Sequence, residues 1–473
     1  MKTKNLARVV EENGFEPGAF SLGDCVRIAT LANSRVSDVV VFETMHRTGL
    51  SEGEVLAAVL DSFAHNFKAL AAGLDGGGSF LFGSVAEEMT GDGAAKVVDD
   101  SLLNKMIVYT LAAQVGNHSI GLEPCAGTGD SCPYAGFVRA ALETYPREEV
   151  ARAAAVLLKI GTIFRVGKTS TGCNMEGYGA GSAAVAAAFV ELAGAPPEAL
   201  GRAVVLAISP TIGTPCTPRV MVPGLCATHI GGAIMNGRLA SHLAIHTCIP
   251  VNVPVDVMIA MATAVHPVSA KAIVPVVIDY MEPYFRTNAA VEKYIDQDIQ
   301  EAEASRKAGV HDKALEMVRS LARKANPIVK PFGIAVVGGS SQAVGSPTNT
   351  GRLAHFLAKG KISKVTIELY PELFARRGIN VPGILMGAVY GASTADGLMY
   401  RQVMERVEKD GVEVIIRQVA EHQLQRVTVE AAERSSMVDA RNRGGGRLAL
   451  IAVVPDTLQC RELAESLHIE IVD

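Results

Sequence analysis

The segment TSTGCNMEGYGAGSAAVAAAFVELAG, residues 169–194, combines the two features that decide the fold of this chain. Its first half is rich in Gly, Ser and Thr and carries Cys173, and its second half, from Ser182, is a run of small apolar residues. Alanine has the highest helix propensity, and small side chains let helix backbones approach closely. The segment therefore predicts a tightly packed helix with a polar, cysteine-bearing loop at one end.

The same alternation of small-residue loops and Ala-rich runs continues on both sides of this segment. Residues 1–75 have the apolar spacing of amphipathic helices, and Ser51 with Glu54 forms a capping-box pattern. We expect a mainly α catalytic domain over residues 1–290, with Gly- and Cys-rich loop ends that converge on one site. The other loops of this kind cover residues 76–80, 89–93, 125–133 and 209–232.

The composition changes after residue 290. A charged stretch predicts a helical connector over residues 291–330 that ends before Pro327. We expect an α+β domain over residues 331–473, because β-branched runs alternate there with helical segments. The runs are GIAVVGG (333–339), KVTIELY (364–370), EVIIRQV (413–419), RVTVEAA (426–432) and RLALIAVVP (447–455).

The composition of the 473-residue chain excludes several classes of protein. The 44 Lys and Arg against 49 Asp and Glu give a net charge of −5, with no strongly basic stretch, so nucleic acid is not an expected partner. Eight Cys are too few for a disulfide scaffold, and the N-terminus lacks the apolar run of a signal peptide. We expect a cytoplasmic protein.

Three charge-free runs resemble membrane spans in composition. Residues 203–218, 220–237 and 239–255 each contain Pro, and the middle run adds several Gly and His229. Such residues are typical of buried segments in a soluble protein rather than of helices facing lipid. We therefore expect no membrane partner.

Two motifs resemble nucleotide-binding loops but lack the required context. VGKTS at 166–170 would need a Gly one position later than Gly161 to form a phosphate loop. GYGAGS at 177–182 has no strand before it and no acidic residue closing a βαβ unit after it. Its glycines favour close helix packing instead.

Cys173, Cys216 and Cys226 each lie in a segment of Gly, Pro and Thr rather than on an apolar helix face. Gly-rich loops expose backbone N–H groups that can donate to a thiolate. Three thiolates suit a zinc site with an open position or a four-iron cluster with one iron left free. Because no Cys-x-x-Cys pair is present, three unrelated thiols are the alternative.

The segments around these cysteines resemble, in order, the α subunit of the iron-sulfur-dependent L-serine dehydratase family. The segments are AEEMTGDGAAKV (86–97), EPCAGTGDSCP (123–133), TGCNMEGYGAGSAAVAAAF (171–189) and GTPCTPRVMVPGLC (213–226). Three later segments follow the order found in the β domain of the same enzymes: 337–352, 364–385 and 441–450. The resemblance thus predicts an α-like half followed by a β-like half in one chain.

The resemblance implies a 4Fe-4S cluster held by Cys173, Cys216 and Cys226. In the family, the open iron acts as a Lewis acid on the hydroxyl of a small 2-amino-3-hydroxy acid, by default L-serine, which gives pyruvate and ammonia. The residues that would bind such a substrate are Thr90, Gly91, Ala126, Gly127, Ser340 and Ser341.

The chain departs from the family pattern at two histidines. One is replaced by Gln342, and the other is missing from residues 378–382. Glutamine cannot take a proton near neutral pH, so another base is needed or the substrate differs. His118 and His229 are the candidate bases, although a lone His is more often structural. Lys168 is a candidate for binding a carboxylate and Glu176 for orienting a ligand.

Three functions follow from this pattern. The first is an L-serine dehydratase. The second is a related lyase acting on another β-hydroxy or β-thiol acid, and the third is a non-catalytic iron-sulfur or redox-sensing protein. The expected partners are a small amino or hydroxy acid and a second copy of the chain in a homodimer.

Overall fold

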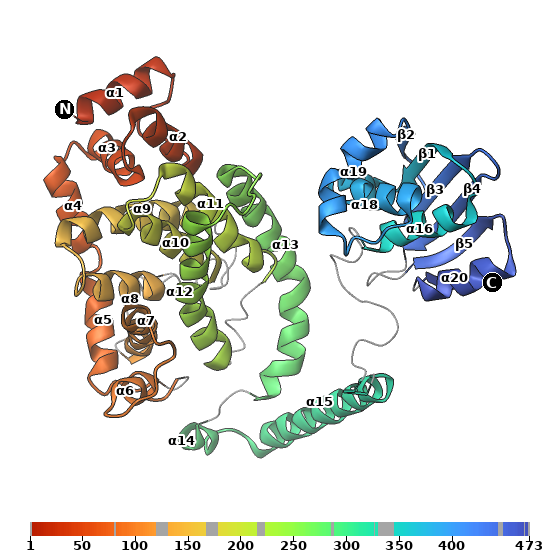
Figure 1. Cartoon of the computed structure of the whole chain (residues 1–473). Coiled ribbons are helices and arrows are strands. Elements are labelled where there is room, and N and C mark those ends of the chain that lie inside the picture. Colours follow the sequence, from red (N-terminus) through yellow and green to blue (C-terminus); the bar gives the residue numbers. More distant parts are fainter. Residues whose placement is uncertain are drawn as a thin grey trace. The chain divides into compact units, whose positions relative to one another are not determined.

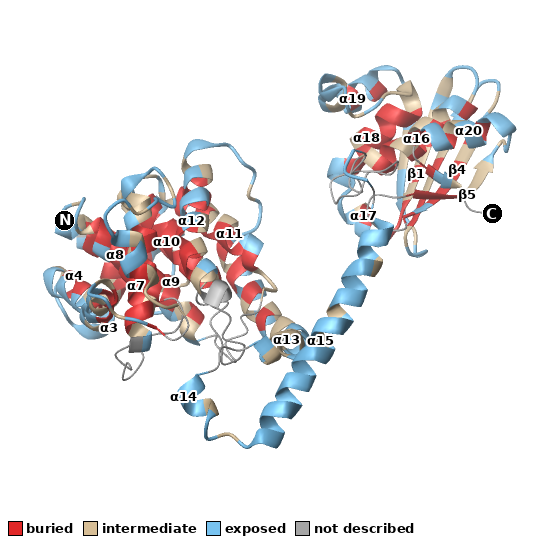
Figure 2. Cartoon of the chain, turned by 90° about the horizontal axis from the view of Figure 1, so that it is seen from below, coloured by how far each residue is buried: buried red, intermediate tan, exposed pale blue. Residues whose placement is uncertain are grey.

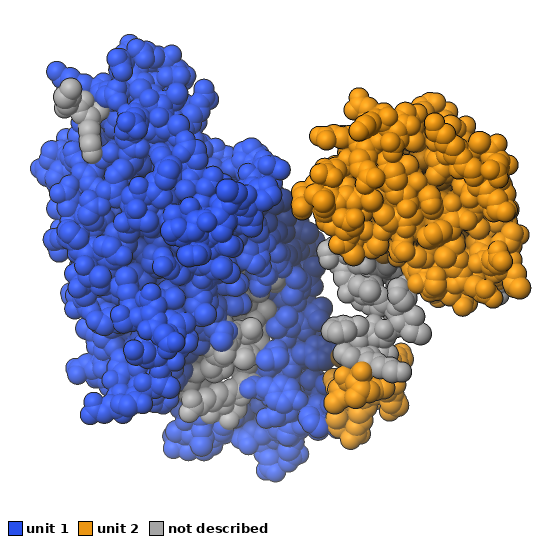
Figure 3. Space-filling view, viewed as in Figure 1, with its two compact units in different colours: residues 1–314 blue, residues 315–473 orange. Residues whose placement is uncertain are grey.

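The computed structural model describes residues 2–79, 82–119, 131–166, 178–214, 223–284, 288–325, 327–329, 345–442, 448–467 and 469–471. The chain divides into two compact units, Met1–Ala314 and Leu315–Asp473 (Figure 3). The first unit is helical, and the second carries a six-stranded mixed sheet (Figure 1). The predicted layout of a mainly α region followed by an α+β region is therefore confirmed.

One helix of the first region, α4 (Glu52–Asp61), begins where the sequence predicts it. The predicted capping box is present, because the Glu54 N–H donates to Ser51 Oγ and the Ser51 N–H donates to the Glu54 carboxylate. The helices are α1 (Lys2–Glu12), α2 (Leu22–Ala32), α3 (Val36–Thr48), α4 (Glu52–Asp61), α5 (Ala64–Leu74), α6 (Val85–Thr90), α7 (Ser101–Ser119), α8 (Ser131–Ala141), α9 (Arg147–Val166), α10 (Gly181–Leu192), α11 (Pro197–Ile208), α12 (Pro223–His246), α13 (Val255–Met281) and α14 (Ala289–Glu292). The connector helix α15 (Gln297–Lys324) ends before Pro327, as predicted.

The core of the first unit depends on close approaches between helix backbones. Every residue of α10 from Gly181 to Glu191 is buried. A Cβ added at Gly136 in α8 would collide with Thr110 and with the Met106 carbonyl in α7, and one added at Gly116 would overlap the backbone of Ala69 in α5. Small residues are therefore required at these crossings.

The second unit is built around a sheet with strand order β2-β1-β3-β4-β5-β6. Its strands are β1 (Ile362–Leu369), β2 (Glu413–Gln418), β3 (Leu424–Ala431), β4 (Ser436–Asn442), β5 (Leu448–Val454) and β6 (Ile469–Ile471). The β1–β2 and β5–β6 pairs are parallel, and the other pairs are antiparallel. The helices are α16 (Ser346–Leu357), α17 (Pro371–Ala375), α18 (Arg377–Tyr390), α19 (Gly397–Lys409) and α20 (Leu458–Ser466).

Four of the five predicted strands are present, and the fifth, at 333–339, lies outside the described residues. Strands β4 and β6 were not predicted. The sequence of β4, SMVDARN, lacks a β-branched run, and β6 has only three residues. The structure places β4 in the middle of the sheet because β3 and β5 pair with it on both sides.

The prediction that the charge-free runs are buried is partly wrong. Residues Thr247 to Pro250 are exposed, because α12 ends at His246 and the prolines at 250 and 254 place the chain on the surface before α13 begins. One described helix, Val255–Tyr284, is long and apolar enough to cross a membrane by length and composition alone.

Candidate functional site

The segment that leads into α10 lies beside the second turn of α12. The rings of Tyr178 and His229 stack with centroids 5.6 Å apart and planes 2° from parallel. Further along, a Cβ at Gly237 would meet Val185. Contacts that advance together along both helices show that α10 and α12 run in the same direction, with their N-termini at one end.

The end of α11 lies beside the middle of α12. Asn236 Nδ2 donates to the Ala207 carbonyl at 2.8 Å, and Arg202 donates to the Ala244 carbonyl. These contacts run in opposite directions along α11 and α12, so the two helices are antiparallel. Thr214 follows the C-terminal end of α11. It is the last described residue before the segment that contains Cys216.

The ends of α7, α8 and α9 form a second group. Cys132 at the start of α8 bonds to Gln114 near the end of α7. A Cβ at Gly161 in α9 would press on the Tyr134 ring in α8, so the end of α9 lies at the level of the start of α8. The segment that contains Cys173 joins this group to the N-terminus of α10.

His118 belongs to a chain of hydrogen bonds in the second group. The Cys132 thiol donates to Gln114 Oε1 at 3.0 Å, and the Gln114 amide nitrogen lies 2.8 Å from His118 Nε2. His118 Nδ1 lies 2.8 Å from Ser79 Oγ. With its oxygen accepting from the thiol, the Gln114 NH₂ donates to Nε2, which places the imidazole proton on Nδ1, toward Ser79. Desolvation lowers the pKa of His118, so the ring is neutral near pH 7.

Beside these hydrogen bonds, two buried polar atoms, Asn117 Oδ1 and Ser131 Oγ, have no hydrogen-bond partner among the described residues. The Asn117 amide nitrogen is used, because it donates to Cys132 Sγ at 3.0 Å. Sequence reasoning missed Gln114, Asn117 and Ser131. Gln114, Asn117 and His118 are spaced i, i+3 and i+4, which puts them on one helix face, and this spacing was the available signal.

His229 occupies a different place from His118. Burial lowers the pKa of His229, and its ring is covered by Tyr178. Two residues later, a Cβ at Gly231 would contact Ile107 of α7, which is eleven residues before His118, or about 16 Å along that helix. No contact between described residues joins the two candidate bases.

Thr90 and Gly91 lie at the end of α6. The Thr90 hydroxyl donates to the Ala86 carbonyl at 2.9 Å, and the Gly91 N–H donates to the Glu87 carbonyl. The donors of both residues therefore serve their own helix. The prediction that Thr90 offers a hydroxyl donor to a substrate has no support in this geometry.

Most of the other predicted site residues lie outside the described residues. These are Ala126, Gly127, Lys168, Cys173, Glu176, Cys216, Ser340 and Ser341. Cys226 is in the first turn of α12, so its predicted loop environment is wrong: Pro223 begins a helix there, as proline at a first helical position often does.

The described cysteines outside this set have ordinary surroundings. Cys25 and Cys460 are buried, and burial raises the pKa of the Cys25 thiol to about 12. Cys248 is exposed. Within the described ranges, no group of three His, Cys, Asp or Glu side chains is placed to hold a metal ion.

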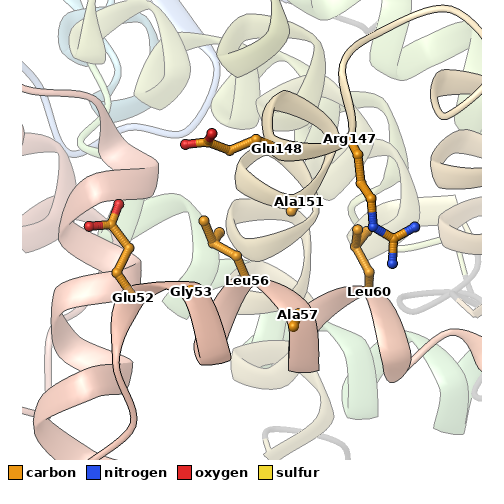
Figure 4. A pocket seen from close by; sticks show the side chains of 8 residues that line it. All are labelled: Glu52, Gly53, Leu56, Ala57, Leu60, Arg147, Glu148 and Ala151. Atoms are coloured by element: carbon orange, nitrogen blue, oxygen red, sulfur yellow. The ribbon is translucent and has the colours of Figure 1, made fainter.

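A surface groove of about 630 Å³ lies between α4 and the start of α9 (Figure 4). Leu56, Ala57 and Leu60 form its apolar part. Its two acidic residues, Glu52 and Glu148, both accept hydrogen bonds from Arg152. None of the predicted site residues lines it. The lining residues are Glu52, Gly53, Leu56, Ala57, Leu60, Arg147, Glu148 and Ala151.

No protein-family model matches this chain, and no curated protein matches it either.

Proposed function

We propose that this protein is a cytoplasmic iron-sulfur lyase that eliminates water from a small 2-amino-3-hydroxy acid, with L-serine as the default substrate. The motifs around Cys173, Cys216 and Cys226 motivate the proposal. The observation that carries it is the Tyr178–His229 stack, which holds a residue preceding α10 beside the second turn of α12. Two segments that bear predicted ligands end at these two helix starts.

The N-termini of α10 and α12 also carry partial positive charge, which suits a cluster held by thiolates. The N-termini of α10 and α12 lie at one end of the helix group, and each presents backbone N–H groups and the positive end of a helix dipole. Thiolate ligands are anionic, so this end favours them. Cys173, Cys216 and Cys226 would hold the cluster, which would supply a Lewis acid to assist departure of the substrate hydroxyl.

The protein's own groups would bind the substrate and move its proton. Neutral His118 accepts a proton at Nε2 once the Gln114 amide is displaced, while Ser79 keeps the Nδ1 proton in place. Asn117 Oδ1 is an acceptor for a substrate ammonium or hydroxyl group, and Ser131 Oγ is a second polar contact. In this proposal, Gln114 positions the base and Cys132 fixes the Gln114 amide.

Anoxic purification followed by visible absorption and a turnover screen tests the proposal. We expect a brown protein that deaminates serine, and a Cys173→Ser variant that loses both colour and activity. Cys248→Ser is the matched control, since Cys248 is an exposed free thiol, and it should keep both. A colourless wild-type protein whose spectrum does not respond to iron and sulfide would end the cluster hypothesis.

The loss of the two family histidines favours a second candidate, a lyase acting on another β-hydroxy or β-thiol acid. The same screen therefore includes threonine, cysteine and small hydroxy acids. A coloured protein that is inactive on serine but active on one of these would select the second candidate. Colour without turnover of any substrate would select the non-catalytic iron-sulfur protein.

A further inference from the structure

Helix α13 packs into the core of the first unit along its first half, and beyond its last turn Glu282 pairs with Arg306 of α15. Val255, Met258, Ile259, Ala262 and His266 are buried. The Asp256 carboxylate accepts hydrogen bonds from Ser21 Oγ at 2.7 Å and from the Gly23 N–H at 2.9 Å, at the start of α2. These contacts fix where the helix begins and in which direction it leaves the core.

The second half of α13 leaves the core with its apolar side chains uncovered. After His266, none of its residues is buried. The exposed side chains include Val268 at 69% and Val276 at 56%, which continue a stripe that starts at Val257 and Met261. Ile273, at 40%, is also exposed but lies on the other side of the helix. About a fifth of the most apolar stretch of the helix is buried. A contiguous apolar face of this kind marks an interaction surface.

Two opposite charges lie on this otherwise uncharged half. Between Asp256 and Glu282 the only charged residues are Lys271 and Asp279. In the part of the chain that the structure describes, neither takes part in an ion pair or a hydrogen bond. They are eight residues apart, or about 12 Å along the helix, with Pro275 midway between them.

We propose that the second half of α13 pairs antiparallel with the same helix of a second copy of this chain, around a two-fold axis near Pro275. In that arrangement Lys271 of each copy lies level with Asp279 of the other copy, so one pairing satisfies both charges twice. Ala272 and Val276 lie between the two ion pairs and allow close approach. The charge order favours this partner, because a parallel pair would place like charges together.

A membrane is a poorer occupant of the same face. The fifteen residues from Pro267 to Met281 span about 22 Å as a helix, which is less than the roughly 30 Å of a hydrocarbon core. Lys271 would lie close to the middle of that span, where a charge is costly. The start of the helix cannot extend the span, since one side of it packs into the core of the first unit through Val255, Met258 and Ile259.

Sedimentation equilibrium on the full chain, with charge reversal, tests the pairing. We expect a dimer for the wild type. Lys271→Glu or Asp279→Lys alone should raise the dimer dissociation constant about a hundredfold, because each creates two like-charge contacts worth roughly 1.4 kcal/mol or more apiece. The double variant Lys271→Glu with Asp279→Lys restores opposite charges and should recover most of the affinity. Lys313→Glu on exposed α15 is the matched control.

Each outcome bears on the pairing and not on the proposed lyase activity. A monomeric wild type at tens of micromolar, or a dimer that neither single charge reversal weakens, would overturn the proposed pairing of α13. Flotation with vesicles of neutral phospholipid, abolished by Val268→Glu, would assign the face to a membrane instead. Far-ultraviolet circular dichroism spectra of the single variants should match the wild type, because both positions are exposed.

Discussion

Helices α10 and α15 differ in how far they are buried and in the surroundings of their charged side chains. All residues of α10 from Gly181 to Glu191 are buried, whereas none of the 28 residues of α15 is (Figure 2). The one charge in α10, Glu191, accepts from Arg35 Nε at 2.7 Å and from Ser37 Oγ. Most of the charges of α15 are solvated. A charged side chain in a buried helix of this protein therefore needs a hydrogen-bonding or ionic partner. A charged side chain in an exposed helix does not, because water solvates it.

The largest test of this difference is the buried guanidinium in α9. Arg152 Nη1 lies 2.9 Å from Asp38 Oδ1, and both side chains are less than a tenth exposed. Arg152→Met would leave the buried Asp38 carboxylate without its cation, so we expect a loss of about 3–5 kcal/mol in the free energy of unfolding. Urea denaturation measures it.

Arg147→Met is the matched control, because Arg147 begins the same helix and is exposed. It should change the free energy of unfolding by less than about 0.5 kcal/mol. If both variants lower the free energy of unfolding by the same amount, the buried pair contributes no more to stability than a surface charge. The proposed difference between buried and exposed charged residues would then be wrong.

The next test makes the same small change in a buried and in an exposed helix. Gly136→Ala adds a methyl group against Thr110 and the α7 backbone, so we expect a destabilisation of about 1–3 kcal/mol from overpacking. Because a backbone atom is among those it meets, a rotamer change alone cannot relieve the contact. Thermal unfolding followed by circular dichroism measures this loss.

The exposed counterpart is Gly309→Ala in α15, where an added Cβ meets nothing within 4 Å. Alanine is favoured over glycine in a helix interior by about 1 kcal/mol, so this variant should stabilise α15. Slower amide hydrogen exchange over residues 297–324 would show it. Faster exchange there would mean that Gly309 makes a contact absent from this structure.

The sequence predicts well what depends on local pattern. The capping box at Ser51, the burial of α10 and the exposure of α15 follow from spacing, small residues and charge. Cys226 was misplaced because Pro223 serves both loops and helix starts, and β4 was missed because neighbouring strands, not its own residues, hold it in the sheet.

The site was less predictable than the fold. His118 could be named from sequence as a candidate base, but its bonds to Gln114 and Ser79 join residues from separate segments. Asn117 Oδ1 and Ser131 Oγ are buried without a partner among the described residues, at the adjoining ends of α7 and α8. Such features depend on tertiary contacts, which spacing alone does not contain.

The smallest expected effect concerns pH. Desolvation lowers the pKa of His118 below its ordinary value of 6.5, so the unfolded chain binds more protons than the folded one between the two values. Stability should therefore fall as the pH drops below about 6.5 and should be regained above it. His118→Gln removes this titration and should flatten the difference in unfolding midpoint between pH 7.5 and 5.5. His311→Gln on exposed α15 should not. An unchanged slope for His118→Gln would show that folding does not desolvate this ring.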